Sequence, residues 1–159
     1  MLKIVLISTL LVIGFCLDVV SMFTNGWIRE QLYIGYTYYG IVPFRNNMPF
    51  WFRLGSVLMY CSFASYLIMI PLFVFVVYRF TLQGYSYNLG IFFNLTSIIA
   101  SIISLEQFVT FLIFAINSDD LSVYSDSSLG YSTYLALLSA ISTVSASGLI
   151  QYVRIRDCR

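Results

Sequence analysis

Residues 2–23 read LKIVLISTLLVIGFCLDVVSMF, an almost unbroken apolar run. A helix of this length rises roughly 30 Å, which is enough to cross the hydrocarbon core of a bilayer. The run therefore predicts a membrane-spanning helix. Its start also resembles a secretory signal, and Val19 and Ser21 would suit cleavage after Ser21. We favour the span because the apolar run continues to Phe23.

Three further stretches have the same character, so that four spans are expected at residues 2–23, 51–78, 89–116 and 130–153. Loops at residues 24–50, 79–88 and 117–129 connect them, and residues 154–159 form a tail. Apolar residues make up 60% of the 159 residues, charged residues only 9%, and the mean hydropathy is +0.88. A soluble fold of this size cannot bury so much apolar surface. We predict an all-α membrane protein, a single four-transmembrane-helix bundle.

The basic residues predict which side of the membrane each loop occupies, because cytoplasmic segments are enriched in Lys and Arg. The distribution favours both termini in the cytoplasm of a multi-pass plasma membrane protein, with segment 24–50 outside. Five basic residues then lie inside and three outside: Lys3, Arg79, Arg154, Arg156 and Arg159 against Arg29, Arg45 and Arg53.

Several classes of function lack the residues they need. The chain has no His, three separated Cys and a net charge of +1 with no basic stretch. These features offer no metal cluster, no general base of the commonest kind and no footprint for nucleic acid. We expect no enzyme, catalytic residue, metal or cofactor. The expected partners are membrane lipid and either another integral membrane protein or a second copy of the chain.

The first loop reads WIREQLYIGYTYYGIVPFRNNMPF from Trp27 to Phe50 and is rich in strand-forming residues. Gly35 divides the strand formers into two short runs, which predicts a small extracellular β-hairpin standing on the bundle. A lone hairpin is marginal in water and should rest on helix ends or on a partner. The aromatic side chains are either a contact surface or anchors in the headgroup region. The candidate contact residues are Trp27, Tyr33, Tyr36, Tyr38 and Tyr39.

Small residues at helical spacing mark one face of the fourth span. Ser132, Ala136 and Ala140 lie four residues apart, and Gly148 extends the series. Small residues let helices approach closely in lipid, where no hydrophobic force drives helices together. The face indicates either a tight monomeric bundle or a docking surface for another membrane protein.

Two acidic residues, Asp18 and Glu106, fall within the predicted spans. Carboxylates in a membrane are costly and mark a buried pair or a functional pathway. For Asp18 we expect a structural role, such as a pair with Arg53 or a bond to backbone. Glu106 is the candidate functional residue, although a neutral, hydrogen-bonded Glu fits the same position.

Four spans with a long first outer loop resemble the superfamily of claudins, peripheral myelin proteins and epithelial membrane proteins. Trp27 stands after the first span, where the family keeps a Trp, and Gly40-Ile41 resembles part of its Gly-Leu-Trp element. Arg53 precedes the second span, as a family arginine does. The resemblance implies a non-enzymatic tetraspan that acts through protein contacts.

The sequence departs from the family pattern in its cysteines, since none lies in segment 24–50, where the family typically has a Cys pair. Cys158 lies in the tail, which ends without the hydrophobic residue of junction-type members, and is a candidate lipidation site. These departures favour an auxiliary subunit of a larger complex, such as an ion channel or receptor. A cell–cell junction protein and a small pore using Glu106 are the alternatives.

Overall fold

The computed structural model describes residues 2–32, 35–84, 87–118 and 127–157. Within them the chain forms four long helices and three short strands. The helices are α1 (Leu2–Phe23), α2 (Phe50–Gln83), α3 (Tyr87–Asn117) and α4 (Tyr131–Asp157), and the strands are β1 (Ile28–Leu32), β2 (Gly35–Tyr39) and β3 (Ser127–Leu129). This confirms the predicted four-helix architecture.

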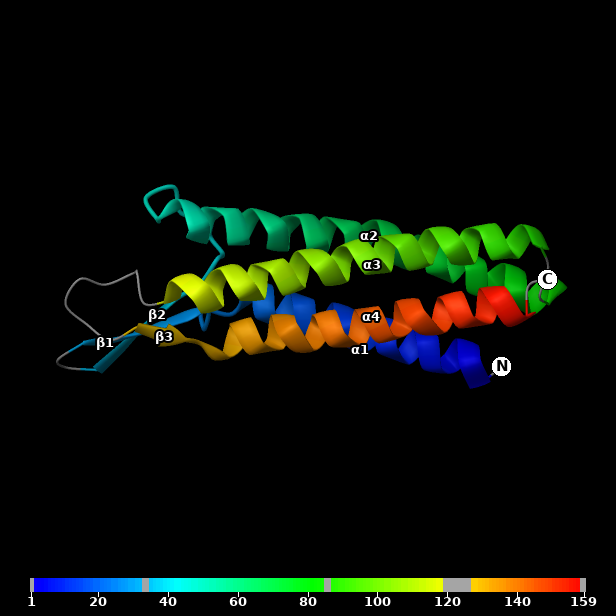
Figure 1. Ribbon diagram of the computed structural model, residues 1–159, viewed down its shortest axis with the longest axis horizontal. Coiled ribbons are helices and arrows are strands. Elements are labelled where there is room, and N and C mark those ends of the chain that lie inside the picture. The colour runs from blue at the N-terminus through cyan, green and yellow to red at the C-terminus, as the bar shows by residue number, and fades with distance from the viewer. Residues whose placement is uncertain (1, 33–34, 85–86, 119–126, 158–159) are drawn as a thin grey trace.

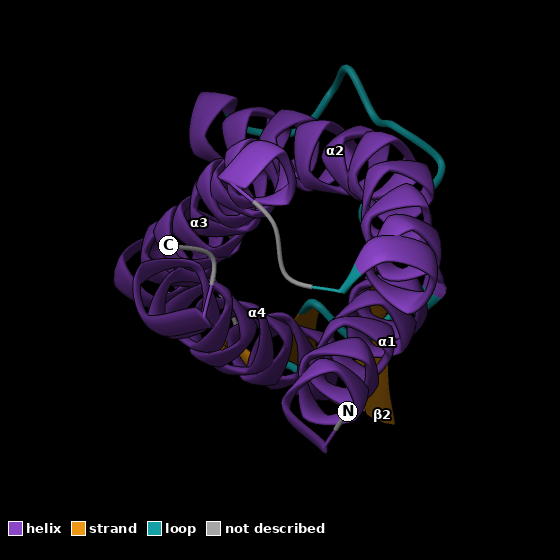
Figure 2. Ribbon diagram, turned by 90° about the vertical axis from the view of Figure 1, so that its right-hand side faces the viewer, coloured by secondary structure: helices purple, strands orange, loops and turns teal. Residues whose placement is uncertain are grey.

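All four helices are long and apolar enough to cross a membrane. They run side by side along the long axis, with the strands at one end and the start of α1 and the end of α4 at the other (Figure 1). Viewed end-on, they form a ring in which each helix lies beside the next and α4 closes against α1 (Figure 2). The outward faces are apolar too, as Ile68, Leu105 and Ile116 show. Such a surface suits lipid rather than water.

Helix α2 continues beyond the predicted span, through Arg79 to Gln83. The apolar run stops near Tyr78, but a charged residue does not break a helix. The backbone hydrogen bonds therefore continue after the hydropathy signal ends, and Gly84 terminates the helix with its N–H bonded to the Phe80 carbonyl.

The interior of the bundle is layered. One apolar cluster fills the half near the termini and includes Ile7, Met69 and Phe93. A second apolar cluster, with Phe52 and Phe114, lies beneath the strands. Between them, at the middle of the bundle, lie six buried polar side chains that we call the central polar network: Asp18, Ser62, Tyr66, Gln107, Ser139 and Thr143.

The three strands form one antiparallel sheet, in the order β2-β1-β3, which we call the cap sheet. The predicted hairpin is its β1–β2 pair, with Gly35 at positive φ opposite Leu32. The third strand, β3, lies in the second loop. The sequence did not predict it, because a strand of three residues carries too little periodic signal. The cap sheet is fixed to α4 through Gly130, where a Cβ would lie 2.0 Å from the Gly26 carbonyl oxygen. Only glycine permits this approach.

The small residues of α4 explain its close packing. Ser132, Ala136 and Ala140 are buried, and the Ala140 carbonyl accepts a 3.0 Å hydrogen bond from Ser104 of α3. Gly148 does not belong to this face, because it is exposed and no atom lies within 4 Å of a Cβ built there. Eight residues beyond Ala140 the helix has turned about 80° past two full turns. Ser147 takes the buried position instead and bonds Ser97 and Ser101 of α3 at 2.8 Å each.

Replacing Ala140 with Leu should lower the free energy of unfolding in detergent by about 1–3 kcal/mol, because the larger side chain does not fit against α3. Thermal unfolding of the purified protein measures the change. Val144→Leu is the matched control, since Val144 is exposed on the same helix. Equal stability of the two variants would show that Ala140 does not face a neighbouring helix.

Candidate functional site

The cap sheet has two unlike faces, because side chains alternate along each strand. Ile28, Tyr39 and Leu129 point toward the bundle and pack on the apolar cluster beneath the sheet. The opposite face carries Tyr36 and Tyr38 of β2, with Arg29 and Gln31 of β1 opposite them. Ser128 of β3 pairs with Arg29 on this face. We call these five residues the exposed cap face.

Two tyrosines dominate the exposed cap face. Tyr36 is 51% exposed and Tyr38 is 46% exposed, although large aromatic side chains gain from burial. The Arg29 guanidinium lies 3.5 Å from the centre of the Tyr36 ring, an arrangement that holds both side chains in place. The result is a preformed aromatic and cationic surface that points away from the helices.

Tyr39 differs from its two neighbours, because its side chain is partly buried on the inner face. Its hydroxyl donates a 2.7 Å hydrogen bond to Glu30. That bond raises the pKa of Tyr39 above its usual value of 10.0, and partial burial adds to the effect. Tyr39 therefore positions the sheet rather than presenting a contact surface. Tyr33, the fourth tyrosine of the predicted surface, lies outside the described residues.

Trp27 is fully buried, and its indole Nε1 donates a 2.7 Å hydrogen bond to the Ser21 carbonyl. That carbonyl belongs to the last turn of α1, where it has no partner within the helix. The Trp27 ring lies 4.9 Å from that of Phe114 of α3, and its backbone carbonyl accepts a bond from Thr133 of α4. The expectation of a partner contact at Trp27 is thus corrected. The residue joins the cap sheet to three helices.

The central polar network joins all four helices through Gln107 of α3. Its amide nitrogen donates to Asp18 Oδ1 of α1 at 2.7 Å and to Ser139 Oγ of α4 at 2.9 Å. Ser62 of α2 donates to the same Asp18 oxygen at 3.0 Å, and Ser139 donates to the Gly14 carbonyl of α1 at 2.7 Å. Sequence reasoning missed Gln107. A signal was present in the sequence, because Gln107 is a second polar residue directly after Glu106 within an apolar span.

The expected pairing of Asp18 with Arg53 is wrong, because the partners of Asp18 are Ser62 and Gln107. Ser62 lies at the level of Asp18, and Arg53 lies nine residues before it on α2, which corresponds to roughly 13 Å along the helix. The expectation of a structural role agrees with these contacts. Among the described residues, no basic side chain bonds Asp18.

Glu106 occupies a different environment from Gln107. Its side chain is only half-buried, and its Oε2 atom is enclosed without a hydrogen-bond partner. A rotation of about 100° between consecutive helical residues turns Gln107 into the bundle and leaves Glu106 at its edge. The structure does not bring Glu106 into the central polar network through any hydrogen bond of the described residues.

A comparison with protein families shows to which family the chain belongs. The sequence profile described as "Tight junction protein, Claudin-like" matches residues 1–158. The chain belongs to this claudin-like family. A search of curated proteins finds no match. The family and the four apolar helices together establish a multi-pass membrane protein.

The residues of the claudin-like resemblance lie around the base of the cap sheet. Gly40 packs against Asn25, whose side-chain oxygen would be 2.6 Å from an added Cβ. Ile41 is fully buried beneath the sheet, and its carbonyl accepts a long, 3.4 Å bond from Tyr60. Arg53 lies in the first turns of α2, with its Nε atom enclosed and without a partner. Trp27, Gly40 and Ile41 therefore act as structural residues of this claudin-like protein.

The claudin-like fold has no disulfide in its first loop, because that loop contains no Cys. Cys16 and Cys61 are free, exposed thiols on α1 and α2. The contacts of Trp27 and the third strand connect the cap sheet to the helices without a disulfide. Cys158, the candidate lipidation site, lies outside the described residues.

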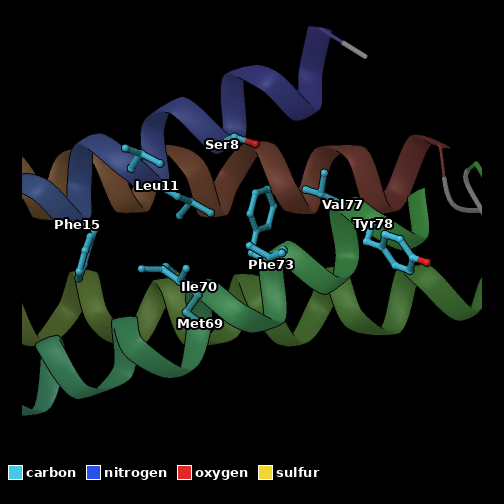
Figure 3. Close-up of a pocket in the computed structure, with 10 residues that line it drawn as sticks. Ser8, Leu11, Phe15, Met69, Ile70, Phe73, Val77 and Tyr78 are labelled. Carbon is cyan, nitrogen blue, oxygen red and sulfur yellow. The ribbon is translucent and has the colours of Figure 1, made fainter. Parts of the chain in front are cut away.

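A groove of about 390 Å³ separates α1 from α2 in the half of the bundle near the termini. Figure 3 shows Leu11 and Phe73 facing each other across it, with Phe15 and Tyr78 toward its two ends. The hydroxyl of Ser8 on its wall donates to the Ile4 carbonyl at 2.8 Å. The lining thus offers hydrocarbon contacts, as expected for a surface in lipid. Among the described residues, no three Cys, Asp or Glu side chains gather to hold a metal ion.

Trp27→Phe should destabilise the protein by about 0.5–1.5 kcal/mol, because the 2.7 Å bond to the Ser21 carbonyl is lost and that acceptor keeps only a longer, 3.2 Å bond from the Thr24 hydroxyl. Thermal unfolding in detergent measures the loss. Trp51→Phe serves as the matched control, since Trp51 is only partly buried at the start of α2 and keeps its ring contacts as Phe. An equal loss in both variants would remove the special role of the Trp27 hydrogen bond.

Proposed function

We propose that this claudin-like protein is a non-enzymatic interaction subunit of a larger plasma membrane complex, such as an ion channel or receptor, and that the exposed cap face binds the partner. The observation that carries the proposal is the pair of exposed tyrosines beside Arg29 on a sheet whose other face is buried. Tyr and Arg are enriched where proteins bind one another, because each combines a large apolar body with a polar group.

The rigidity of this surface supports the same proposal. The sheet is paired on both sides of β1, and its inner face rests on the helix ends. A preformed surface loses little conformational entropy on binding. The proposal places both chain termini in the cytoplasm and the exposed cap face outside the cell, as the distribution of basic residues indicates.

A junctional adhesion role is the second candidate, and the description of the matching family favours it. Two observations weigh toward the subunit role: the first loop lacks a Cys pair, and the described residues give the cap sheet three short strands. Enrichment of the protein where two expressing cells touch, and not where an expressing cell touches a non-expressing one, would favour adhesion.

Tyr36→Ser combined with Tyr38→Ser should reduce the recovery of the partner at least several-fold without lowering surface expression, because the change removes the apolar contact area and no buried contact. Quantitative mass spectrometry of proteins that co-purify in mild detergent compares the variant with the wild type. Tyr78→Ser is the matched control, a tyrosine that is 60% exposed toward the opposite end of the bundle. Unchanged recovery in the double variant would contradict the proposed contact surface.

A further inference from the structure

The central polar network has a surplus of acceptors, which a count of hydrogens reveals. Ser139 donates its hydroxyl hydrogen to the Gly14 carbonyl, and Thr143 donates to the Ser139 carbonyl at 2.8 Å. The Tyr66 hydroxyl lies against the Thr143 hydroxyl oxygen and is therefore the donor in that contact. Both amide hydrogens of Gln107 and the hydroxyl hydrogen of Ser62 are used as well. No hydrogen of these groups is left to donate.

Two oxygens stay without a donor: Oδ2 of Asp18 and Oε1 of Gln107. Both side chains are fully buried. An unsatisfied polar oxygen in such a place costs about 1–3 kcal/mol, and an unsatisfied charge costs more. The central polar network therefore lacks one hydrogen that could bond these two oxygens to each other.

The surroundings disfavour a negative charge on Asp18. Two titratable groups of the described residues interact electrostatically with Asp18: Tyr66 of α2, which is neutral at physiological pH, and Glu106 of α3, a second acid beside Gln107. Helix α4 presents only the hydroxyls of Ser139 and Thr143. In the described residues no Lys or Arg hydrogen-bonds to the carboxyl, so an ionised Asp18 would be a buried charge without a counter-ion.

We propose that Asp18 binds a proton on Oδ2, and that the central polar network is a proton site in the middle of the bundle. The proton makes the carboxyl neutral and supplies the missing hydrogen, and Oε1 of Gln107 is the acceptor available to it. Loss of the proton at alkaline pH leaves a charge among side chains that hold four helices together. The site would thus make helix packing depend on pH, independently of the exposed cap face.

Infrared spectroscopy of protein labelled with ¹³C-aspartate tests the site directly in the wild type. The expected result is an isotope-shifted band of a protonated carboxylic acid at neutral pH. That band should vanish in Asp18→Asn, which identifies it among the five aspartates, and persist in Glu106→Gln. If the Asn variant does not fold, Asp18→Glu removes the label from the site and serves the same purpose. The absence of the band in the wild type, or its persistence without Asp18, would overturn the proposal.

The stability of Asp18→Asn provides a second, independent test. Its amide is neutral and adds N–H donors, so the variant should unfold at the same temperature as the wild type or higher at neutral pH. The wild type should lose thermal stability as pH rises and the proton leaves, whereas the variant should lose less. A wild type and a variant with the same loss across alkaline pH would contradict proton binding at Asp18.

Discussion

The bilayer interior contains no water to satisfy polar groups, and this constraint governs the whole structure. It explains why the helices are apolar on their outer faces, and why the side chains of the central polar network bond one another across helices. The side-chain amide of Gln107 is the central case, because it bonds α1 and α4 simultaneously while Ser62 brings in α2 through Asp18. In lipid, where apolar contacts alone give helices no preference for one another, such bonds and small residues select one arrangement.

The same reasoning applies at the end of the bundle. The Ser21 carbonyl in the last turn of α1 accepts from the Trp27 indole, and the backbone carbonyls of Gly26 and Trp27 accept from the N–H groups of Ser132 and Gly130 at the start of α4. The polypeptide that meets these requirements is also the base of the cap sheet. The inner face of the sheet is consequently fixed, and its outer face is free to carry Tyr36 and Tyr38. Structural needs thus account for the buried residues, and they make no comparable demand on the exposed Tyr36 and Tyr38.

The sequence predicted the features that follow from composition along the chain, such as the spans. It missed the features that follow from the rotation of a residue around its helix, such as which side chains face the interior. Hydropathy located the four helices, and Gly35 located the hairpin. The third strand has three residues and carries no periodic signal, so only the structure revealed it. Trp27 shows what the sequence could not predict for the site. An amphipathic side chain beside a span fits either an exposed or a buried position. Trp27 is buried because its indole N–H bonds the Ser21 carbonyl. Gly148 and Gln107 illustrate the other limit, since one residue of helical rotation moves a side chain from lipid to the interior.

The central claim is that the chain crosses the membrane four times with the cap sheet on one side and the α2–α3 connection on the other. Single cysteines at Ser128 and Thr81, in a background without the three native cysteines, can be labelled with an impermeant maleimide in intact cells. The account predicts labelling at position 128 in intact cells and at position 81 only after permeabilisation. Labelling of both positions in intact cells, or of position 81 alone, would contradict it.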